Sequence, residues 1–142
     1  MDIRPITPAY AVSPQIDPAD IPAIKAAGYV AIINNRPDME IPPEFQTDAM
    51  AAAADAAGLK FYANPVTHAT LNMDMVATQM AAAEDAGGPV LAYCASGTRS
   101  SIVWSLGMAG KMPTDQIIAA TAAHGYDLAG LAPRIDQLAE QA

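Results

Sequence analysis

The amino-acid sequence predicts an α/β protein, a three-layer sandwich in which helices cover both faces of a central, mainly parallel sheet. Short apolar runs alternate with helix-like stretches along the chain, which is the pattern of strands joined by helical crossovers. The runs at residues 29–33 and 90–93 are apolar at every position, as strands buried on both faces are. With 142 residues, 52% of them hydrophobic and 15% charged, the chain can bury the core of one domain, expected over residues 1–142.

The first part of the chain contains two expected strands and one expected helix. Residues 1–8 are a polar lead with prolines, and residues 9–13 are a short edge strand that the next proline ends. Asp17 is a typical helix N-cap, followed by a proline at the first helical position, and Gly28 ends that helix. Residues 29–33 then form a central parallel strand.

The remaining elements continue the alternation of strands and helices. After a proline-bearing loop, Thr47 or Asp48 caps an alanine-rich helix that ends at Gly58, and residues 59–63 form the next strand. A helix over residues 72–86 places its apolar side chains on one face. Further helices are expected over residues 102–108, 115–123 and 133–141.

The chain is organised around the stretch between the strand at 90–93 and the helix that follows it. Successive N–H groups in such a tight turn point into one concavity, with the positive end of the helix dipole beneath, and form an anion cradle. Cys94, the only cysteine, lies there, and Arg99 adds a planar fork for an oxyanion. A lone cysteine at a strand end can also be a small core residue. We expect Cys94 and Arg99 to be catalytic, with anion-binding groups from Ala95, Ser96, Gly97, Thr98 and Ser100.

Two of these expectations leave alternatives open. The Ser100 hydroxyl can donate a hydrogen bond to Cys94, it can cap the helix, and both roles can hold together. Arg36 lies at the carboxyl end of the strand at 29–33, where parallel sheets bind ligands, and is expected to bind an anion. Alternatively, Arg36 pairs with Asp38 or Glu40 in a structural role.

The net charge argues against two classes of partner, and the single cysteine indicates the cellular compartment. The net charge of −8 argues against nucleic acid and against anionic membranes. No apolar run approaches the length of a membrane span, and no signal peptide is recognised at the start. A single cysteine cannot form an internal disulfide, so a reducing cytoplasm is expected. The sequence implies no metal and no organic cofactor.

The Cys94 loop resembles the active-site loops of cysteine-dependent phosphatases and of rhodanese sulfurtransferases. Tyrosine and dual-specificity phosphatases carry a His-Cys-x5-Arg motif, whereas here four residues separate Cys94 from Arg99 and Tyr93 replaces the histidine. The whole chain resembles a bacterial family of phosphatase-like domains, found alone or fused to a metallo-β-lactamase-type persulfide dioxygenase. This resemblance implies a cysteine-dependent phosphatase-like fold. The matching segments are residues 13–16, 30–38, 64–66, the Cys94 loop and 124–128.

Phosphatases of this fold place a general acid, usually an aspartate, on the loop after a neighbouring strand. The acid protonates the leaving oxygen, because an alkoxide leaves poorly at neutral pH. Here that loop, residues 64–70, contains no carboxylate, and His68 is its only candidate acid.

The short loop and the missing carboxylate favour sulfur transfer. The expected enzyme is a rhodanese-type sulfurtransferase that forms a Cys94 persulfide from thiosulfate or a low-molecular-weight persulfide and passes the sulfur to a thiol, sulfite or cyanide. Its expected partners are these small-molecule donors and acceptors, with a persulfide dioxygenase as a candidate protein partner. The alternatives are a dual-specificity-like phosphatase that works through a phosphocysteine and a non-catalytic anion-binding module.

Overall fold

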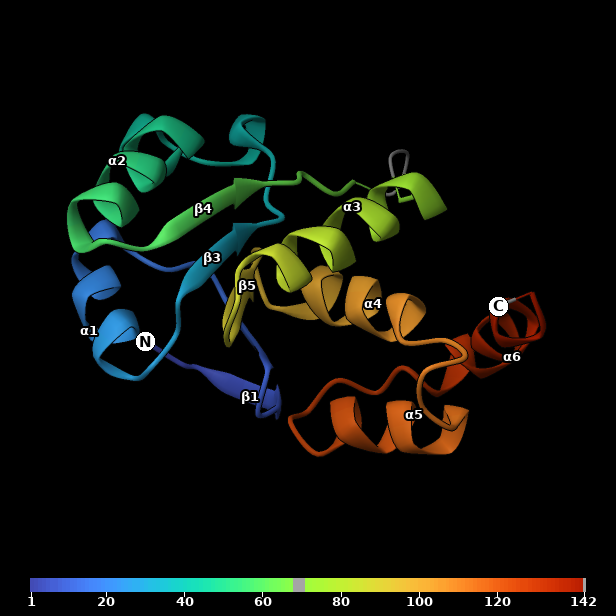
Figure 1. Cartoon of the computed structure of the whole chain (residues 1–142). Helices are drawn as coiled ribbons and strands as arrows, with labels where there is room; N and C mark the ends of the chain where they lie inside the picture. The colour runs from blue at the N-terminus through green and yellow to red at the C-terminus, as the bar shows by residue number, and fades with distance from the viewer. Residues whose placement is uncertain (68–70, 142) are drawn as a thin grey trace.

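The computed structural model describes residues 1–67 and 71–141 and contains a five-stranded sheet. Helices cover both of its faces (Figure 1). The strand order is β1-β2-β5-β3-β4, and every neighbouring pair is parallel except β1 with β2. The predicted fold class is therefore confirmed. The strands are β1 (Arg4–Thr7), β2 (Tyr10–Ser13), β3 (Ala31–Asn34), β4 (Lys60–Ala63) and β5 (Val90–Tyr93).

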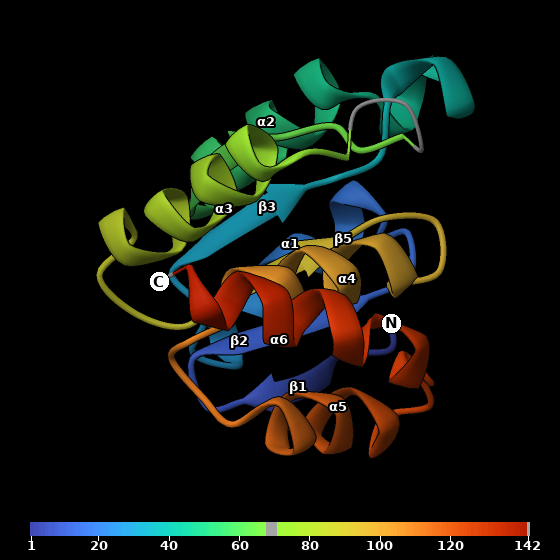
Figure 2. The same ribbon diagram turned by 90° about the vertical axis from the view of Figure 1, so that its right-hand side faces the viewer.

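The helices form the outer two layers (Figure 2). One layer contains α1 (Ile21–Ala26) and α2 (Thr47–Ala57). The other contains α3 (Met73–Asp85), α4 (Thr98–Gly107), α5 (Thr114–Ala122) and α6 (Ala132–Glu140). Within the described residues, no helix is both long and apolar enough to cross a membrane. Short 3₁₀ turns complete the connections: η1 (Pro18–Asp20), η2 (Asp38–Glu40), η3 (Pro43–Phe45) and η4 (Ala129–Leu131).

Two hydrophobic clusters lie on opposite faces of the sheet, because side chains alternate along each strand. Ile32 and Leu91 belong to the cluster beneath α1 and α2. The adjacent residues Ile33 and Ala92 belong to the cluster beneath α3 and α4, together with Trp104. Fully apolar strands are thus explained by a sheet that is covered on both faces.

The N-terminal segment differs from its prediction. Residues 4–7, expected in a polar lead, form β1, and β2 is consequently an inner strand instead of the edge. The pairing is antiparallel, with Arg4 opposite Val12, and its register shifts between Pro5 and Thr7. An edge strand pairs on one side only and therefore tolerates a proline and polar residues. The same residue types are also common in loops, so the local sequence does not indicate a strand here.

Two helix starts show how capping is supplied here. Asp17 forms the predicted cap: its side chain accepts a hydrogen bond from Ala19 N–H, and Asp20 bonds back to the Asp17 N–H. The expected caps of α2 are wrong, because Gln46 precedes the helix and the Asp38 carboxylate accepts the Thr47 N–H at 2.7 Å. Asp38, nine residues before the first residue of α2, thus caps the helix in place of Thr47 or Asp48.

The carboxyl ends of the four parallel strands lie in register. Tyr93 is opposite both Ser13 and Asn34, and Asn34 is opposite Ala63. The next residue after β5 is Cys94. This edge of the sheet is where a parallel α/β sheet binds ligands, so the fold places the predicted nucleophile at the expected edge.

Candidate active site

The Cys94 loop turns directly from β5 into α4. Cys94 is buried, with 1% of its surface exposed. Gly97 is the N-cap of α4 and has a left-handed φ of 93°. Its backbone N–H donates to the Cys94 Sγ at 3.1 Å. The loop therefore directs a backbone donor and the N-terminus of α4 at the sulfur, as in sites that bind anions.

Arg99 lies on the first turn of α4 and binds the neighbouring loops. Its Nη1 donates to Glu40 Oε2 and to the Val66 carbonyl, both at 2.8 Å, and its Nη2 donates to Glu40 Oε1 at 2.8 Å. Among the described residues, these bonds use both N–H groups of Nη1 and one of Nη2. The Nε–Nη2 edge is thereby left as the fork that can bind two oxygens of an anion.

Both Glu40 and Cys94 affect the pKa of the Arg99 guanidinium. Hydrogen bonding to Glu40, the largest cause, raises the pKa of Arg99; burial opposes this, and the interaction with Cys94 adds to the rise. The hydrogen bond from Arg99 in turn lowers the pKa of Glu40. Arg99 is therefore permanently charged and lies close to the sulfur.

Glu40 is a site residue that the sequence did not identify as such. It ends η2, in the loop after β3, and its carboxylate receives both Arg99 bonds. The sequence offered Glu40 only as a partner for Arg36, since nothing local connects it to a residue 59 positions away.

Arg36 occupies the neighbouring position on the same carboxylate. Its Nε lies 3.4 Å from Glu40 Oε1, and its Nη1 lies 3.3 Å from Gln15 Oε1. Arg36 thus makes the structural pair considered from the sequence, and its predicted anion binding stays a prediction. Arg36 is linked to Arg99 through the shared carboxylate of Glu40.

The other predicted residues of the Cys94 loop make different hydrogen bonds. The Ala95 carbonyl accepts from Gln15 N–H at 3.2 Å, which fastens the outer part of the loop to the segment after β2. Ser96 and Thr98 bond each other through their hydroxyls at 3.0 Å. Within the described residues, only the Gly97 amide of the expected cradle bonds the sulfur.

A buried hydrogen-bond network lies behind the loop and is centred on Gln79 of α3, which is fully buried. Gln79 exchanges two hydrogen bonds with the Asn35 amide, at 2.6 and 2.9 Å. It also accepts from Asn64 at 3.0 Å and donates to the Tyr10 hydroxyl at 2.9 Å. The Tyr10 hydroxyl in turn donates to the Ser100 carbonyl at 3.0 Å. The network thus connects β2, α3 and the residues that follow β3 and β4 to the first turn of α4.

Ser100 belongs to this network, and this corrects its expected role. Its hydroxyl donates to Asn35 Oδ1 at 2.8 Å. A hydroxyl has one proton, so Ser100 cannot donate to Cys94 at the same time. Its side chain points into the buried network and positions the loop from behind.

The expected acid, His68, lies outside the described residues. The described part of the same loop contributes the Val66 carbonyl, which accepts from Arg99 at 2.8 Å. This contact places the loop after β4 beside Arg99.

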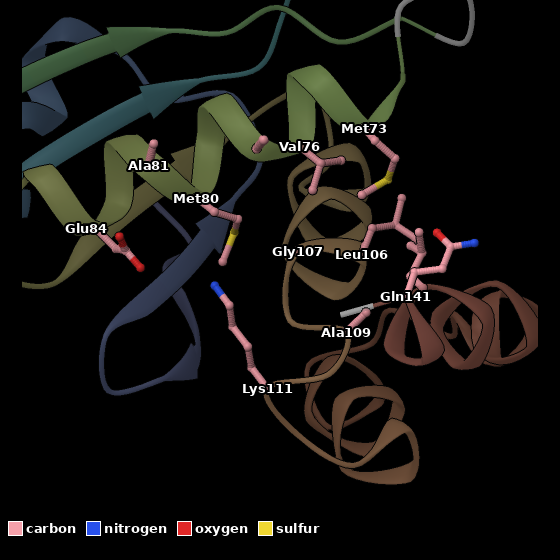
Figure 3. A pocket seen from close by; sticks show the side chains of 12 residues that line it. Met73, Val76, Met80, Ala81, Glu84, Leu106, Gly107, Ala109, Lys111 and Gln141 are labelled. Carbon is pink, nitrogen blue, oxygen red and sulfur yellow. The ribbon is translucent and has the colours of Figure 1, made fainter.

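Two hollows differ in their relation to the site. The larger, of about 530 Å³, lies between α3, α4 and α6 and is lined mainly by apolar side chains such as Met80 and Leu106 (Figure 3). Cys94 and Arg99 do not line it. A smaller hollow, of about 380 Å³, lies at the carboxyl ends of β3 and β4 and is lined by Arg36 and Pro65 among others. Cys94 and Arg99 do not line the smaller hollow either, but Arg36, one of the predicted anion-binding residues, does.

Comparison with known proteins identifies relatives of the chain. Residues 2–111 match the family described as beta-lactamase hydrolase-like protein, phosphatase-like domain. A beta-lactamase hydrolase-like protein of Xylella fastidiosa (strain Temecula1) is 37% identical over 131 residues, which cover 90% of this chain and 30% of that relative. One from Agrobacterium fabrum (strain C58) is 39% identical over 113 residues, covering 78% and 26%. The chain spans less than a third of either relative.

Solved structures share the fold over nearly the whole chain. A candidate phosphatase from Neisseria meningitidis Z2491 has 34% identity and a TM-score of 0.82, covering 97% of this chain and 99% of that one. Tk-PTP in its active form has 16% identity and a TM-score of 0.75, covering 99% and 97%. Kinase associated phosphatase, with its catalytic site cysteine substituted by serine, has 10% identity and a TM-score of 0.69, covering 93% and 86%. The fold is therefore that of the cysteine-dependent phosphatases.

These comparisons contradict the expected sulfurtransferase. The matching family and the solved structures are phosphatase-like, and they support an enzyme of that fold. The expectation relied on the shorter spacing between Cys94 and Arg99. The structure accommodates this spacing because Gly97, in its left-handed conformation, begins α4 at once. Arg99 on the first turn remains close to the sulfur, so the residue count does not exclude a phosphate site.

Proposed function

The chain belongs to the phosphatase-like domain family of beta-lactamase hydrolase-like proteins, and on this basis we propose that it is a cysteine-dependent phosphatase acting through a phosphocysteine on Cys94. One observation carries the proposal. At the N-terminus of α4, the Gly97 N–H donates to the Cys94 sulfur, and Arg99 lies on the first turn of the same helix with its charge acting on that sulfur. A phosphoryl dianion needs such a set of fixed donors around its oxygens.

The reaction follows from these groups. A lone pair of the Cys94 thiolate forms the S–P bond, while the bond from phosphorus to the leaving oxygen breaks and its electron pair departs with that oxygen. Arg99 and the Gly97 amide bind the non-bridging oxygens, where negative charge is held in the transition state. Water then attacks phosphorus and gives up a proton, the S–P bond breaks with its pair returned to sulfur, and inorganic phosphate leaves.

The leaving group defines the substrate class that we propose. The loop at residues 64–70 contains no carboxylate, so a poor leaving group would depart without the usual acid. Phosphate monoesters of acidic alcohols, such as aryl phosphates, need this proton least. The hollow beside Arg36, lined by Pro37 and Pro65, offers an apolar surface for the body of such an ester.

The test is Cys94-dependent hydrolysis of p-nitrophenyl phosphate, compared between the wild type and Cys94→Ser. We expect turnover by the wild type, loss of turnover in the variant, and a phosphoryl adduct on Cys94 in the mass of the acid-quenched protein. Hydrolysis that persists in Cys94→Ser would overturn the proposal. A wild type that binds phosphate but forms no adduct and no product would instead indicate an anion-binding module.

A further inference from the structure

Tyr126 reaches the Cys94 loop from the C-terminal part of the chain. It follows α5 and lies beyond residues 2–111, which match the family. Its N–H bonds the Thr121 carbonyl at 3.1 Å, which fastens the backbone to α5. Its side chain is buried, with 5% exposed, and its hydroxyl donates to the Ser96 carbonyl at 2.9 Å. Tyr126 therefore binds the loop itself.

The contact acts on one particular peptide group. The Ser96 carbonyl and the Gly97 N–H belong to the same planar, trans peptide, so they point in opposite directions. The carbonyl is bound by Tyr126, and the N–H is directed at the Cys94 sulfur at 3.1 Å. Holding the carbonyl therefore fixes the direction of the donor that faces the nucleophile.

This peptide would otherwise be free to rotate. Gly97 has no Cβ, and glycine adopts positive and negative φ with similar ease. Among the described residues, Tyr126 is the one hydrogen-bond donor to the Ser96 carbonyl. If that bond were lost, a rotation of the peptide could turn the carbonyl oxygen toward the anion site. An oxygen there would repel the thiolate and a bound phosphate alike.

Tyr126 is itself held in place. The Arg4 guanidinium lies 5.1 Å from the centre of the Tyr126 ring, and Arg4 is paired with Asp2. Burial, the largest cause, raises the pKa of Tyr126, so its hydroxyl keeps the proton that it donates. A Cβ built on Gly97 would overlap this hydroxyl. The Tyr126 hydroxyl can therefore occupy this position only because residue 97 has no side chain.

We infer that Tyr126 is a positioning residue, which holds the Ser96–Gly97 peptide so that the Gly97 N–H faces the Cys94 sulfur and an oxygen of the bound phosphate. The part that concerns phosphate rests on the proposed function. The part that concerns the sulfur does not, and it can be measured without any substrate.

The experiment compares Tyr126→Phe with the wild type. Phenylalanine keeps the ring and its contact with Arg4 and removes the hydroxyl alone. We measure the rate of Cys94 alkylation by iodoacetamide across pH, and kcat and KM for p-nitrophenyl phosphate, at a temperature where both proteins are folded by circular dichroism. We expect alkylation at neutral pH and kcat each to fall roughly twofold to tenfold, the worth of one hydrogen bond. The rise of alkylation with pH should move to higher pH.

The control is Tyr62→Phe, which removes a hydroxyl bonded to Asp85 at 2.7 Å on another part of the molecule. It should match the wild type in both assays. Equal alkylation profiles for wild type and Tyr126→Phe would overturn the inference. If the wild type hydrolyses no phosphate ester, the proposed function fails, and the alkylation comparison still decides the role of Tyr126.

Discussion

The carboxylate of Glu40 binds both terminal nitrogens of Arg99 at 2.8 Å. This paired contact joins the loop after β3 to the first turn of α4 and fixes the plane of the guanidinium. The side chains are only partly exposed, 32% for Glu40 and 21% for Arg99. Since the contact occupies one edge of the guanidinium, it determines which edge remains for a substrate anion.

Arg99→Lys should remove the fork and keep the charge. A lysine ammonium has no planar pair of donors for two phosphate oxygens. We expect kcat/KM for p-nitrophenyl phosphate to fall about a hundredfold, as when a donor to transition-state charge is lost. Arg134→Lys, the same change at an exposed position of α6, is the control and should leave kcat/KM unchanged. Equal kcat/KM for Arg99→Lys and the wild type would mean that Arg99 binds no substrate.

The Glu40–Arg99 pair should make stability depend on acid pH. The hydrogen bond from Arg99 lowers the pKa of Glu40 in the folded protein. The stabilisation is therefore present above the ordinary carboxyl pKa, about 4.3, and is lost as the pH falls through the lowered value. Because the pair is partly exposed, we expect it to contribute below about 1 kcal/mol at neutral pH.

Denaturant unfolding of the wild type and Glu40→Gln at several pH values measures this contribution. The difference in unfolding free energy between the two proteins should shrink on acidification. A difference that stays constant or grows as the pH falls would contradict the assignment.

The place of the Cys94 loop between β5 and α4 could be predicted from the sequence because its signals are local. Cys94, Gly97 and Arg99 lie within six consecutive positions after an apolar run, and a strand that turns into a helix must direct its N–H groups into the loop. The function could not be settled from the same residues. The loop between Cys94 and Arg99 is one residue shorter than the phosphatase motif. This difference would separate the two chemistries only if it moved the arginine away from the loop, and Arg99 still lies on the first turn of α4.

The supporting residues could not be predicted because each depends on contacts between distant segments. Gln79 lies in a helix, where a glutamine is usually exposed. Its burial becomes clear only when Asn35 and Asn64 reach it from the segments that follow β3 and β4. Tyr126 binds a backbone carbonyl, which leaves no mark in the sequence of its partner. Glu40 becomes part of the site only once the loop after β3 meets α4.

Gln79→Leu should destabilise the fold substantially. Leucine has a similar size and no hydrogen-bonding groups, so it removes one partner from the buried Asn35 amide, the part-buried Asn64 amide and the buried Tyr10 hydroxyl. Each of these groups keeps another hydrogen bond, so the cost is that of the four lost bonds, about 0.5–1.5 kcal/mol each, and with some relaxation we expect a total loss of about 2–4 kcal/mol. The control, Gln116→Leu at an exposed position of α5, should change stability by less than about 0.5 kcal/mol. Urea unfolding that gives equal stabilities for the two variants would rule out a stabilising network.

Gly97→Ala should cost more than its backbone conformation alone explains. Gly97 and Gly28 have similar positive φ values, 93° and 102°. A Cβ at Gly28 meets nothing within 4 Å, whereas one at Gly97 overlaps the Tyr126 hydroxyl. Gly28→Ala should therefore lose about 1–2 kcal/mol from the left-handed conformation alone.

Gly97→Ala should lose at least about 1 kcal/mol more than Gly28→Ala, because the overlap forces the loop or the tyrosine to move. It should also lose hydrolysis, since the displaced peptide carries the N–H that faces Cys94. The double variant Gly97→Ala with Tyr126→Phe should recover part of the lost stability, because the hydroxyl is the atom nearest to the added Cβ. Urea unfolding of the four proteins measures these differences. Equal losses for the two glycine variants, with no recovery in the double variant, would show that Tyr126 does not constrain this peptide.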